Sequence, residues 1–365
     1  EIGNDVPNLR VCIDRLVEGA ERQIEAHCVD PAIYDASPDE SEDASVALRP
    51  VFGPPDVVLL DLPAQSSSPN DPHNVKLAVY ADPWPGSVDV YRGSEDQSFE
   101  FVQSVATPSI TGVLLEDLAP GPVALIHHGG TTVVKVPTGA LSSISHDALL
   151  NGANLAAITG PNGQEIIQFA SAQLVEPGRY RINGLVRGLG GTEASAALGA
   201  PAGSRFVVLD ETIEDLQVPA STLFHGTTLR AEPHDGGIGA FSRTQLSAIA
   251  MPRSLQPLAP VHAQAKQVEN GDIAMQWVRR ARGVADLWEL PTVPLNEEAE
   301  LCQITVLQGA VTVRQAEVQI TAWLYTHADQ VADGVSGSAS SVSFCVAQIG
   351  TSGRLGQSRK FALAT

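Results

Sequence analysis

Two histidines and two carboxylates lie close together on a glycine-rich stretch, at His225, Glu232, His234 and Asp235. Imidazole and carboxylate groups form a donor set that binds divalent metals. The stretch lacks the His-Glu-x-x-His spacing that places two imidazoles on one helix face, and histidines on loops are usually solvated. We therefore predict no metal site and no cofactor, and we keep His225, His234 and Asp235 only as candidates for contact with a partner.

A second glycine-rich stretch, residues 187–193 (RGLGGTE), directly follows an expected strand. A Walker loop ends in Gly-Lys-Ser/Thr, but here Gly191 is followed by Thr192 with no lysine between them. A dinucleotide fingerprint would need a third glycine where Glu193 stands. The pattern favours a tight backbone turn at the end of a hairpin, pinned by Arg187 or Glu193, over a nucleotide site.

The sequence carries no signature of a catalytic nucleophile. It has no Gly-x-Ser-x-Gly elbow, the turn that exposes a serine in α/β-hydrolases. Ser145, His146 and Asp147 are adjacent in the chain, whereas the members of a triad come from separate segments and meet in space. A glycosidase-type carboxylate pair would have to be chosen from 42 acidic residues. We therefore name no catalytic residue.

Tryptophan is the other residue type that could form a contact. Trp84 lies in the rigid turn Pro83-Trp84-Pro85-Gly86, whereas Trp277 stands mid-strand and is expected in a core. An indole on a loop either packs on a neighbouring strand or presents its ring to a sugar or a protein partner. Packing is the commoner outcome, so Trp84 is a surface-contact candidate on residue type alone.

The composition excludes several classes of protein. The 22 Lys and Arg stand against 42 Asp and Glu, a net charge of −20, and nucleic-acid binding needs a basic face. The 43% hydrophobic content is too high for an acidic disordered chain. No apolar run approaches the roughly 20 residues of a membrane span. We expect a folded protein with no direct nucleic-acid binding and no transmembrane segment.

The four cysteines, Cys12, Cys28, Cys302 and Cys345, form no Cys-x-x-Cys pair, and each lies in an apolar strand-like run. Strand alternation places Cys302 and Cys345 on different faces. We predict that all four are free thiols. A separate charge cluster, Arg279, Arg280 and Arg282, is expected to pair across strands with Glu297, Glu298 and Glu300.

Short β-branched runs between 32 Gly and 25 Pro predict a mainly β protein with several β-rich domains in tandem. Residues 1–52 are expected to hold a hairpin at 9–16 and 21–29, followed by an acidic connector. Residues 53–255 form a central β-rich domain, with a division into two subdomains near 140 left open. Residues 256–365 have the size of one β-sandwich. The clearest helical patch is 148–158 (ALLNGANLAAI).

Taken together, the motifs resemble one family. Residues 180–193 (YRINGLVRGLGGTE) resemble the Y-x-L-x-x-L-L-R-G-x-x-G-T-E stretch of tail-tip host-specificity proteins of gene transfer agents and related siphophages of alphaproteobacteria. Further stretches match that family in the same order: 13–15 (IDR), 24–26 (IEA), 58–63 (VLLDLP), 82–86 (DPWPG), 90–91 (VY), 150–154 (LNGAN), 168–169 (QF), 255–262, 277–280 (WVRR), Trp288, 293–295 (VPL) and 346–348 (VAQ).

The resemblance implies the C-terminal part of a large baseplate protein, located in the tail of a virion or gene-transfer-agent particle and made in the bacterial cytoplasm. Residues 1–52 resemble the end of its hub-type domain, and such hubs assemble as trimers. Implied partners are other tail proteins and a glycan or protein of the recipient envelope. The last block resembles a fibronectin type III sandwich, although Val342 stands where that fold usually has the tyrosine of its corner.

Two other functions remain open at this point. The chain could be a tail-associated enzyme that cleaves cell-wall or surface polysaccharide, which a turnover assay would reveal. It could also be a secreted carbohydrate-binding protein. The resemblance favours a structural tail component, whose work is assembly and attachment rather than catalysis.

Overall fold

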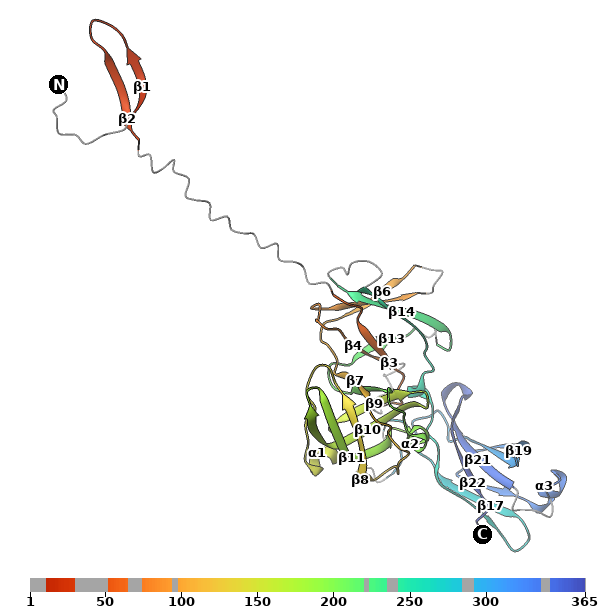
Figure 1. The fold of residues 1–365 in the computed structure, drawn as a ribbon. Coiled ribbons are helices and arrows are strands. Elements are labelled where there is room, and N and C mark those ends of the chain that lie inside the picture. The colour runs from red at the N-terminus through yellow and green to blue at the C-terminus, as the bar shows by residue number, and fades with distance from the viewer. Residues whose placement is uncertain are drawn as a thin grey trace. The chain divides into compact units, whose positions relative to one another are not determined.

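The computed structural model describes residues 11–29, 52–64, 74–93, 98–219, 223–234, 242–283, 292–335 and 342–364. Antiparallel strands dominate it, as the composition predicts (Figure 1). The chain divides into two compact units, Glu1–Val51 and Phe52–Thr365. No helix of the described part is long and apolar enough to cross a membrane.

The described part of the first unit is the predicted hairpin, formed by β1 (Val11–Val17) and β2 (Gln23–Cys28). A β-bulge between Ile13 and Arg15 keeps Leu16 on the same face as Ile13, because the extra residue offsets the two-residue alternation of side chains. That face is apolar throughout: Val11, Ile13, Leu16, Ile24, Ala26 and Cys28. Every side chain of both strands is exposed, an arrangement that is marginal in water for two strands alone.

The second unit begins with a seven-stranded sandwich. One sheet has the order β13-β4-β3 and the other β15-β14-β5-β6. The strands are β3 (Asp56–Leu60), β4 (Asn74–Tyr80), β5 (Val88–Gly93), β6 (Glu100–Val105), β13 (Glu214–Gln217), β14 (Gly226–Pro233) and β15 (Thr244–Ile249). Alternate residues of both sheets meet in a core that includes Leu77, Val90 and Leu229.

A closed six-stranded barrel is inserted into this sandwich between β6 and β13, with the order β10-β11-β8-β7-β12-β9. Its strands are β7 (Thr111–Leu114), β8 (Ile126–Lys135), β9 (Leu155–Gly160), β10 (Gly163–Glu176), β11 (Arg179–Leu189) and β12 (Arg205–Val208), with helices α1 (His146–Leu150) and α2 (Glu193–Leu198). The barrel encloses its own apolar core around Phe169, Ile182 and Phe206.

The barrel and the sandwich share buried surface. Val58 and Leu60 of β3 form one core cluster with Ile166 of β10 and Val207 of β12. Gln164 Nε2 donates to the carbonyl of Leu59 at 3.0 Å. The insertion is therefore fastened to its host sheet by apolar packing as well as by its two chain connections.

Within residues 53–255, the structure bears on one question that the sequence left open and contradicts one prediction. The barrel takes β8 from one side of residue 140 and β9 from the other, so the chain has no division there. Residues 148–158 do not form one helix, because α1 ends at Leu150 and β9 starts at Leu155. Between α1 and β9, Gly152 and Asn154 both have positive φ, and the chain turns there. Gly152 adopts such a φ at no steric cost.

The C-terminal block is a second sandwich, with sheets β16-β17-β20 and β19-β18-β21-β22. Its strands are β16 (Val261–Gln267), β17 (Ile273–Val278), β18 (Cys302–Gln308), β19 (Val311–Val318), β20 (Ala322–Tyr325), β21 (Val342–Ile349) and β22 (Leu355–Ala362), with helix α3 (His327–Ala332). This is the strand order of a fibronectin type III sandwich, and it repeats the order of the first sandwich strand for strand. Trp277 is 4% exposed in its core, as predicted.

The cysteine and charge predictions can be checked against this sandwich. All four cysteines are free; Cys302 points into the core and Cys345 is only partly buried. Burial raises the pKa of both thiols. Arg282 pairs with Glu297 at 2.7 Å and Arg279 with Glu300 at 3.3 Å, as expected, but these residues lie in the connection between β17 and β18 and not on paired strands. Arg280 instead meets Glu193 of the barrel helix α2 at 2.5 Å.

The buried tyrosine at the end of this sandwich comes from β20 and not from position 342, where the fold usually has its corner tyrosine. Tyr325, at the end of β20, is fully buried, and its hydroxyl donates to Asp333 Oδ2 at 2.7 Å. Arg314 Nε donates to the same oxygen at 2.6 Å. Trp323 stacks on the Tyr325 ring with centroids 5.4 Å apart. Tyr325 thus anchors the C-terminal end of α3 through Asp333, whereas Val342 is a buried core residue.

Replacing Tyr325 by Phe should lower the free energy of unfolding by about 1–3 kcal/mol, because a buried hydrogen bond to a carboxylate is lost. Urea-induced unfolding of the chain at pH 7 measures the change. The same substitution at Tyr180, a buried tyrosine of the barrel, is the matched control. An equal effect at both positions would contradict the anchoring role of Tyr325.

Acid should weaken the same corner. The hydrogen bond from Arg314 holds the pKa of Asp333 below its ordinary value, so in acid the unfolded chain takes up a proton that the folded chain resists. The stabilisation is present at neutral pH and is lost as the pH falls through the acidic range, from about 4 downward. Unfolding followed from pH 7 to pH 3 should show a shallower decline for Asp333→Asn than for wild type, and an unchanged decline would refute the assignment.

Candidate functional site

Trp84 is held by packing. Its ring is partly buried against the core of the first sandwich, and its indole Nε1 donates to the carbonyl of Gly86 at 3.0 Å. The turn that carries it connects β4 to β5. Its ring serves mainly to close the sandwich end, which is the alternative that the sequence favoured.

The histidines nominated from the sequence lie far apart. His225 directly precedes β14 and His234 directly follows it, and nine residues of extended chain span about 30 Å. They cannot bind one metal ion together. Asp235 lies outside the described residues, and among those that are described no three His, Cys, Asp or Glu side chains form a metal-binding group. His234 Nδ1 lies 2.9 Å from Oδ2 of Asp89 on the neighbouring strand β5.

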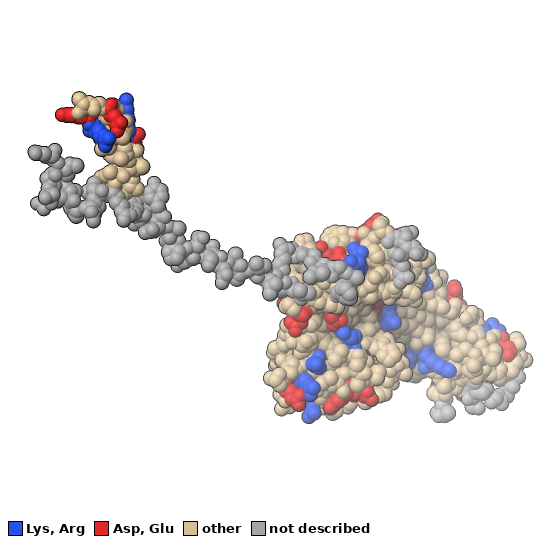
Figure 2. All heavy atoms as spheres, turned by 45° about the horizontal axis from the view of Figure 1, so that its top comes forward, with Lys and Arg blue, Asp and Glu red and all other residues tan. Residues whose placement is uncertain are grey.

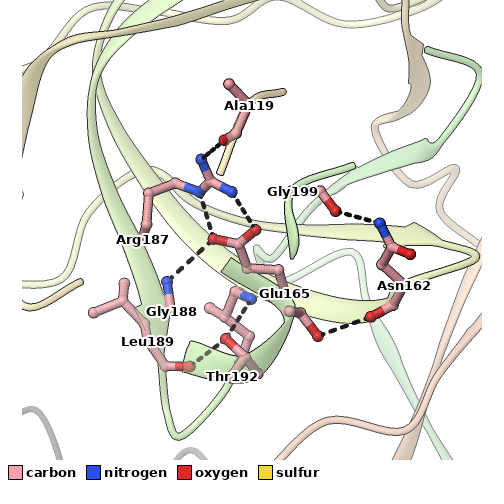
Figure 3. Close-up of polar contacts among 10 residues, drawn as sticks. Ala119, Asn162, Glu165, Arg187, Gly188, Leu189, Thr192 and Gly199 are labelled. Atoms are coloured by element: carbon pink, nitrogen blue, oxygen red, sulfur yellow. Dashed lines mark hydrogen bonds and ion pairs between the residues drawn. The ribbon is translucent and has the colours of Figure 1, made fainter. Parts of the chain in front are cut away.

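The glycine-rich stretch at 187–193 encloses a buried ion pair (Figure 3). Arg187 is 2% exposed. Its Nε and Nη2 donate to Oε1 and Oε2 of Glu165 at 2.5 and 2.7 Å, and its Nη1 donates to the carbonyl of Ala119 at 3.0 Å. Two parallel bonds between guanidinium and carboxylate are the strongest geometry for such a pair. Of the two residues that the sequence offered, Arg187 therefore pins the turn, whereas Glu193 pairs with Arg280.

Two further groups of this turn also have partners within the barrel. Glu165 Oε1 accepts the Gly188 backbone N–H at 3.2 Å, and Thr192 Oγ1 accepts from the Ile166 N–H and donates to the Leu189 carbonyl. Gly188 has a φ of 69°, and a Cβ there would lie 2.8 Å from Val123. The turn thus directs its donors into the barrel, which argues for a structural role rather than phosphate binding.

The feature that sequence reasoning missed is a set of side chains on the outer face of the sheet β15-β14-β5-β6. Arg230 of β14 lies between two aromatic rings, 4.8 Å from the centroid of Tyr91 and 4.5 Å from that of Phe99. Phe101 of β6 meets Tyr91 edge-on at 5.7 Å and is 59% exposed. We call Tyr91, Phe99, Phe101 and Arg230 the aromatic–arginine face.

Carboxylates border the aromatic–arginine face. Glu232 Oε2 lies 3.5 Å from Arg230 Nε. Partial burial, followed by the nearby charges of Asp89 and Glu232, raises the pKa of Tyr91. Alternation in residues 229–233 (LRAEP) was a usable signal, because Leu229 and Ala231 face the core while Arg230 and Glu232 face outward. The sequence could not reveal which strands would lie beside them.

The fold and site define a tandem β protein with an inserted barrel, and comparison with known proteins singles out the barrel. Residues 109–207 match the family model described as "Rcc01698-like, C-terminal", and these bounds coincide with the barrel, whose first and last strands are β7 and β12. The Arg187–Glu165 pair lies within them. No curated protein matches the chain.

Solved structures with fibronectin-type modules also match. Chicken CNTN1 FN1–FN3 domains are 9% identical, with 86% of this chain and 100% of that chain covered at a TM-score of 0.20. Titin domains A168–A170 are 8% identical, with coverages of 86% and 99% at a TM-score of 0.19. At such scores the superpositions do not support an assignment, and the fibronectin type III arrangement of the sandwiches is assigned from strand order.

Replacing Arg187 by Met should lower the free energy of unfolding by about 3–5 kcal/mol, because the Glu165 carboxylate stays buried without its partner. Adding Glu165→Gln to that variant should restore part of the loss. The control is Arg179→Met, which breaks the exposed pair with Glu176 at the other end of the same hairpin and should cost about 0–1 kcal/mol. Urea-induced unfolding distinguishes the variants, and equal losses at Arg187 and Arg179 would contradict the anchoring role.

Proposed function

We propose that this chain is a structural component of a phage-like tail baseplate, of the kind carried by gene transfer agents, and that it contributes to tail-tip assembly and to attachment to the recipient cell envelope. The observation that carries the proposal is the match of residues 109–207 to the "Rcc01698-like, C-terminal" family. The ordered motifs across the rest of the chain support it.

The architecture suits assembly. The barrel shares a buried apolar cluster with the first sandwich, and the Arg280–Glu193 pair links the second sandwich to α2 of the barrel. Arg282 Nη1 also donates to the carbonyl of Ser254, in the segment that joins the two sandwiches, at 3.0 Å. Contacts of this kind between modules favour a rigid structural protein over an enzyme whose domains close on a substrate.

The proposed partners follow from the same role. Other tail proteins would surround the chain, the hub-like N-terminal part would bring three copies together, and a glycan or protein of the envelope would be the target. On the face shown in Figure 2, Lys and Arg lie interspersed with Asp and Glu over the described residues. A surface of mixed sign suits contact with neighbouring proteins better than a grip on DNA, which needs a basic face.

An epitope placed at the exposed β18–β19 turn, beside Gly309, tests the location in a bacterium that produces such particles. Gold-labelled antibody should mark the tail end of purified particles. A second strain carrying Arg187→Met should yield fewer tagged, infective or gene-transferring particles, while Arg179→Met should leave the yield unchanged. Tagged protein that fractionates away from particles would refute the proposal.

A further inference from the structure

The outer face of the sheet β15-β14-β5-β6 has a composition that its structural role does not require. The core-facing residues, among them Val88, Val90 and Leu229, already close the sandwich. The aromatic–arginine face lies on the opposite side of the same strands, where Arg230 pairs in register with Tyr91, and Tyr91 with Phe101. Phe101 nevertheless remains 59% exposed.

The aromatic part offers a stacking surface. Arg230 already occupies the space between the rings of Tyr91 and Phe99, and this stacking limits the freedom of all three side chains. Phe101 meets Tyr91 in a T-shaped contact and is 59% exposed, so much of its ring stays accessible. An exposed aromatic ring on a rigid strand can stack against the C–H face of a sugar ring with little loss of side-chain entropy.

The polar part supplies both kinds of hydrogen-bonding group. Glu232 is an acceptor and Arg230 is a donor, and both side chains are partly exposed. Asp89 is buried beneath them, with its Oδ2 facing His234, and it contributes negative charge rather than direct contact. Gln245 and Ser247 of β15 are exposed beside Arg230 and Thr228 of β14. Sugar hydroxyls both donate and accept, so such a mixture fits them.

Charge decides between possible occupants. The cores of protein–protein interfaces share the aromatic and arginine content of this face but are depleted of Asp and Glu, whereas Glu232 and Asp89 lie directly beside its rings. One arginine against two carboxylates also disfavours a polyanionic chain, because like charges brought together reduce affinity. Resting on the proposed attachment function, we propose that the aromatic–arginine face binds a neutral, hydroxyl-rich polysaccharide, with Phe101 as the stacking residue and Arg230 and Glu232 as hydrogen-bonding groups.

Affinity electrophoresis of the purified chain through gels containing dextran, mannan or galactan, with alginate as the polyanionic comparison, tests this inference. At least one neutral polymer should retard the wild type, and alginate should not. Phe101→Ala should weaken that retardation about tenfold or more, which corresponds to about 1.4 kcal/mol, and Phe101→Tyr should restore it. Leu174→Ala is the matched control, since Leu174 is a 58% exposed strand residue of the barrel.

Thermal unfolding should show that Phe101→Ala folds like the wild type, because Phe101 is exposed. Glu232→Gln keeps the shape of the side chain and gives a second test, in which retardation should weaken several-fold. Retardation by none of the neutral polymers, retardation by alginate alone, or equal retardation of Phe101→Ala would overturn the proposal. So would binding to isolated envelopes that protease abolishes and polysaccharide removal leaves intact. These tests use the purified chain, so their outcome does not depend on whether the protein is found in particles. Failure of polysaccharide binding can therefore be distinguished from failure of the proposed tail function.

Discussion

The buried pair between Arg187 and Glu165 is the constraint on which the barrel depends. Removing two charges from water costs several kcal/mol for each ion, and only near-ideal geometry with further hydrogen bonds offsets that cost. Here the two side chains make two bonds with each other, and the Ala119 carbonyl and Gly188 N–H occupy two further sites. The pair therefore fixes how the end of β11 meets β10 and the segment before β8.

This constraint extends outward through packing. The turn that Arg187 holds leads into α2, whose Glu193 pairs with Arg280 of the second sandwich, while Ile166 of β10, next to Glu165, lies in the cluster shared with β3 of the first sandwich. Substituting one partner of the ion pair would leave a charge buried where three β modules meet. Residues 187–193, which resemble a phosphate-binding loop in sequence, thus lie at the junction between the barrel and the two sandwiches of the second unit.

The first sandwich shows why sequence reasoning succeeded locally and failed globally. Short-range patterns predicted the mainly β class of this region, and residue type favoured the packed position of Trp84 that the structure shows. The sandwich itself was missed because residues 106–213 separate β6 from β13, and nothing local indicates that strands so far apart share a core. The prediction of a helix at 148–158 was wrong because residues 155–158 pair as part of β9 in the barrel.

The sequence alone determined the mainly β class, the free cysteines and the core position of Trp277, and it limited the residue that pins the 187–193 turn to Arg187 or Glu193, because each follows from residue type and short-range spacing. Only the tertiary structure could decide the insertion of the barrel, the separation of His225 from His234 along β14, and the assembly of Tyr91, Phe99, Phe101 and Arg230 on one face. The physical reason is strand pairing: register brings together residues more than a hundred positions apart, and no local pattern specifies which edges will meet.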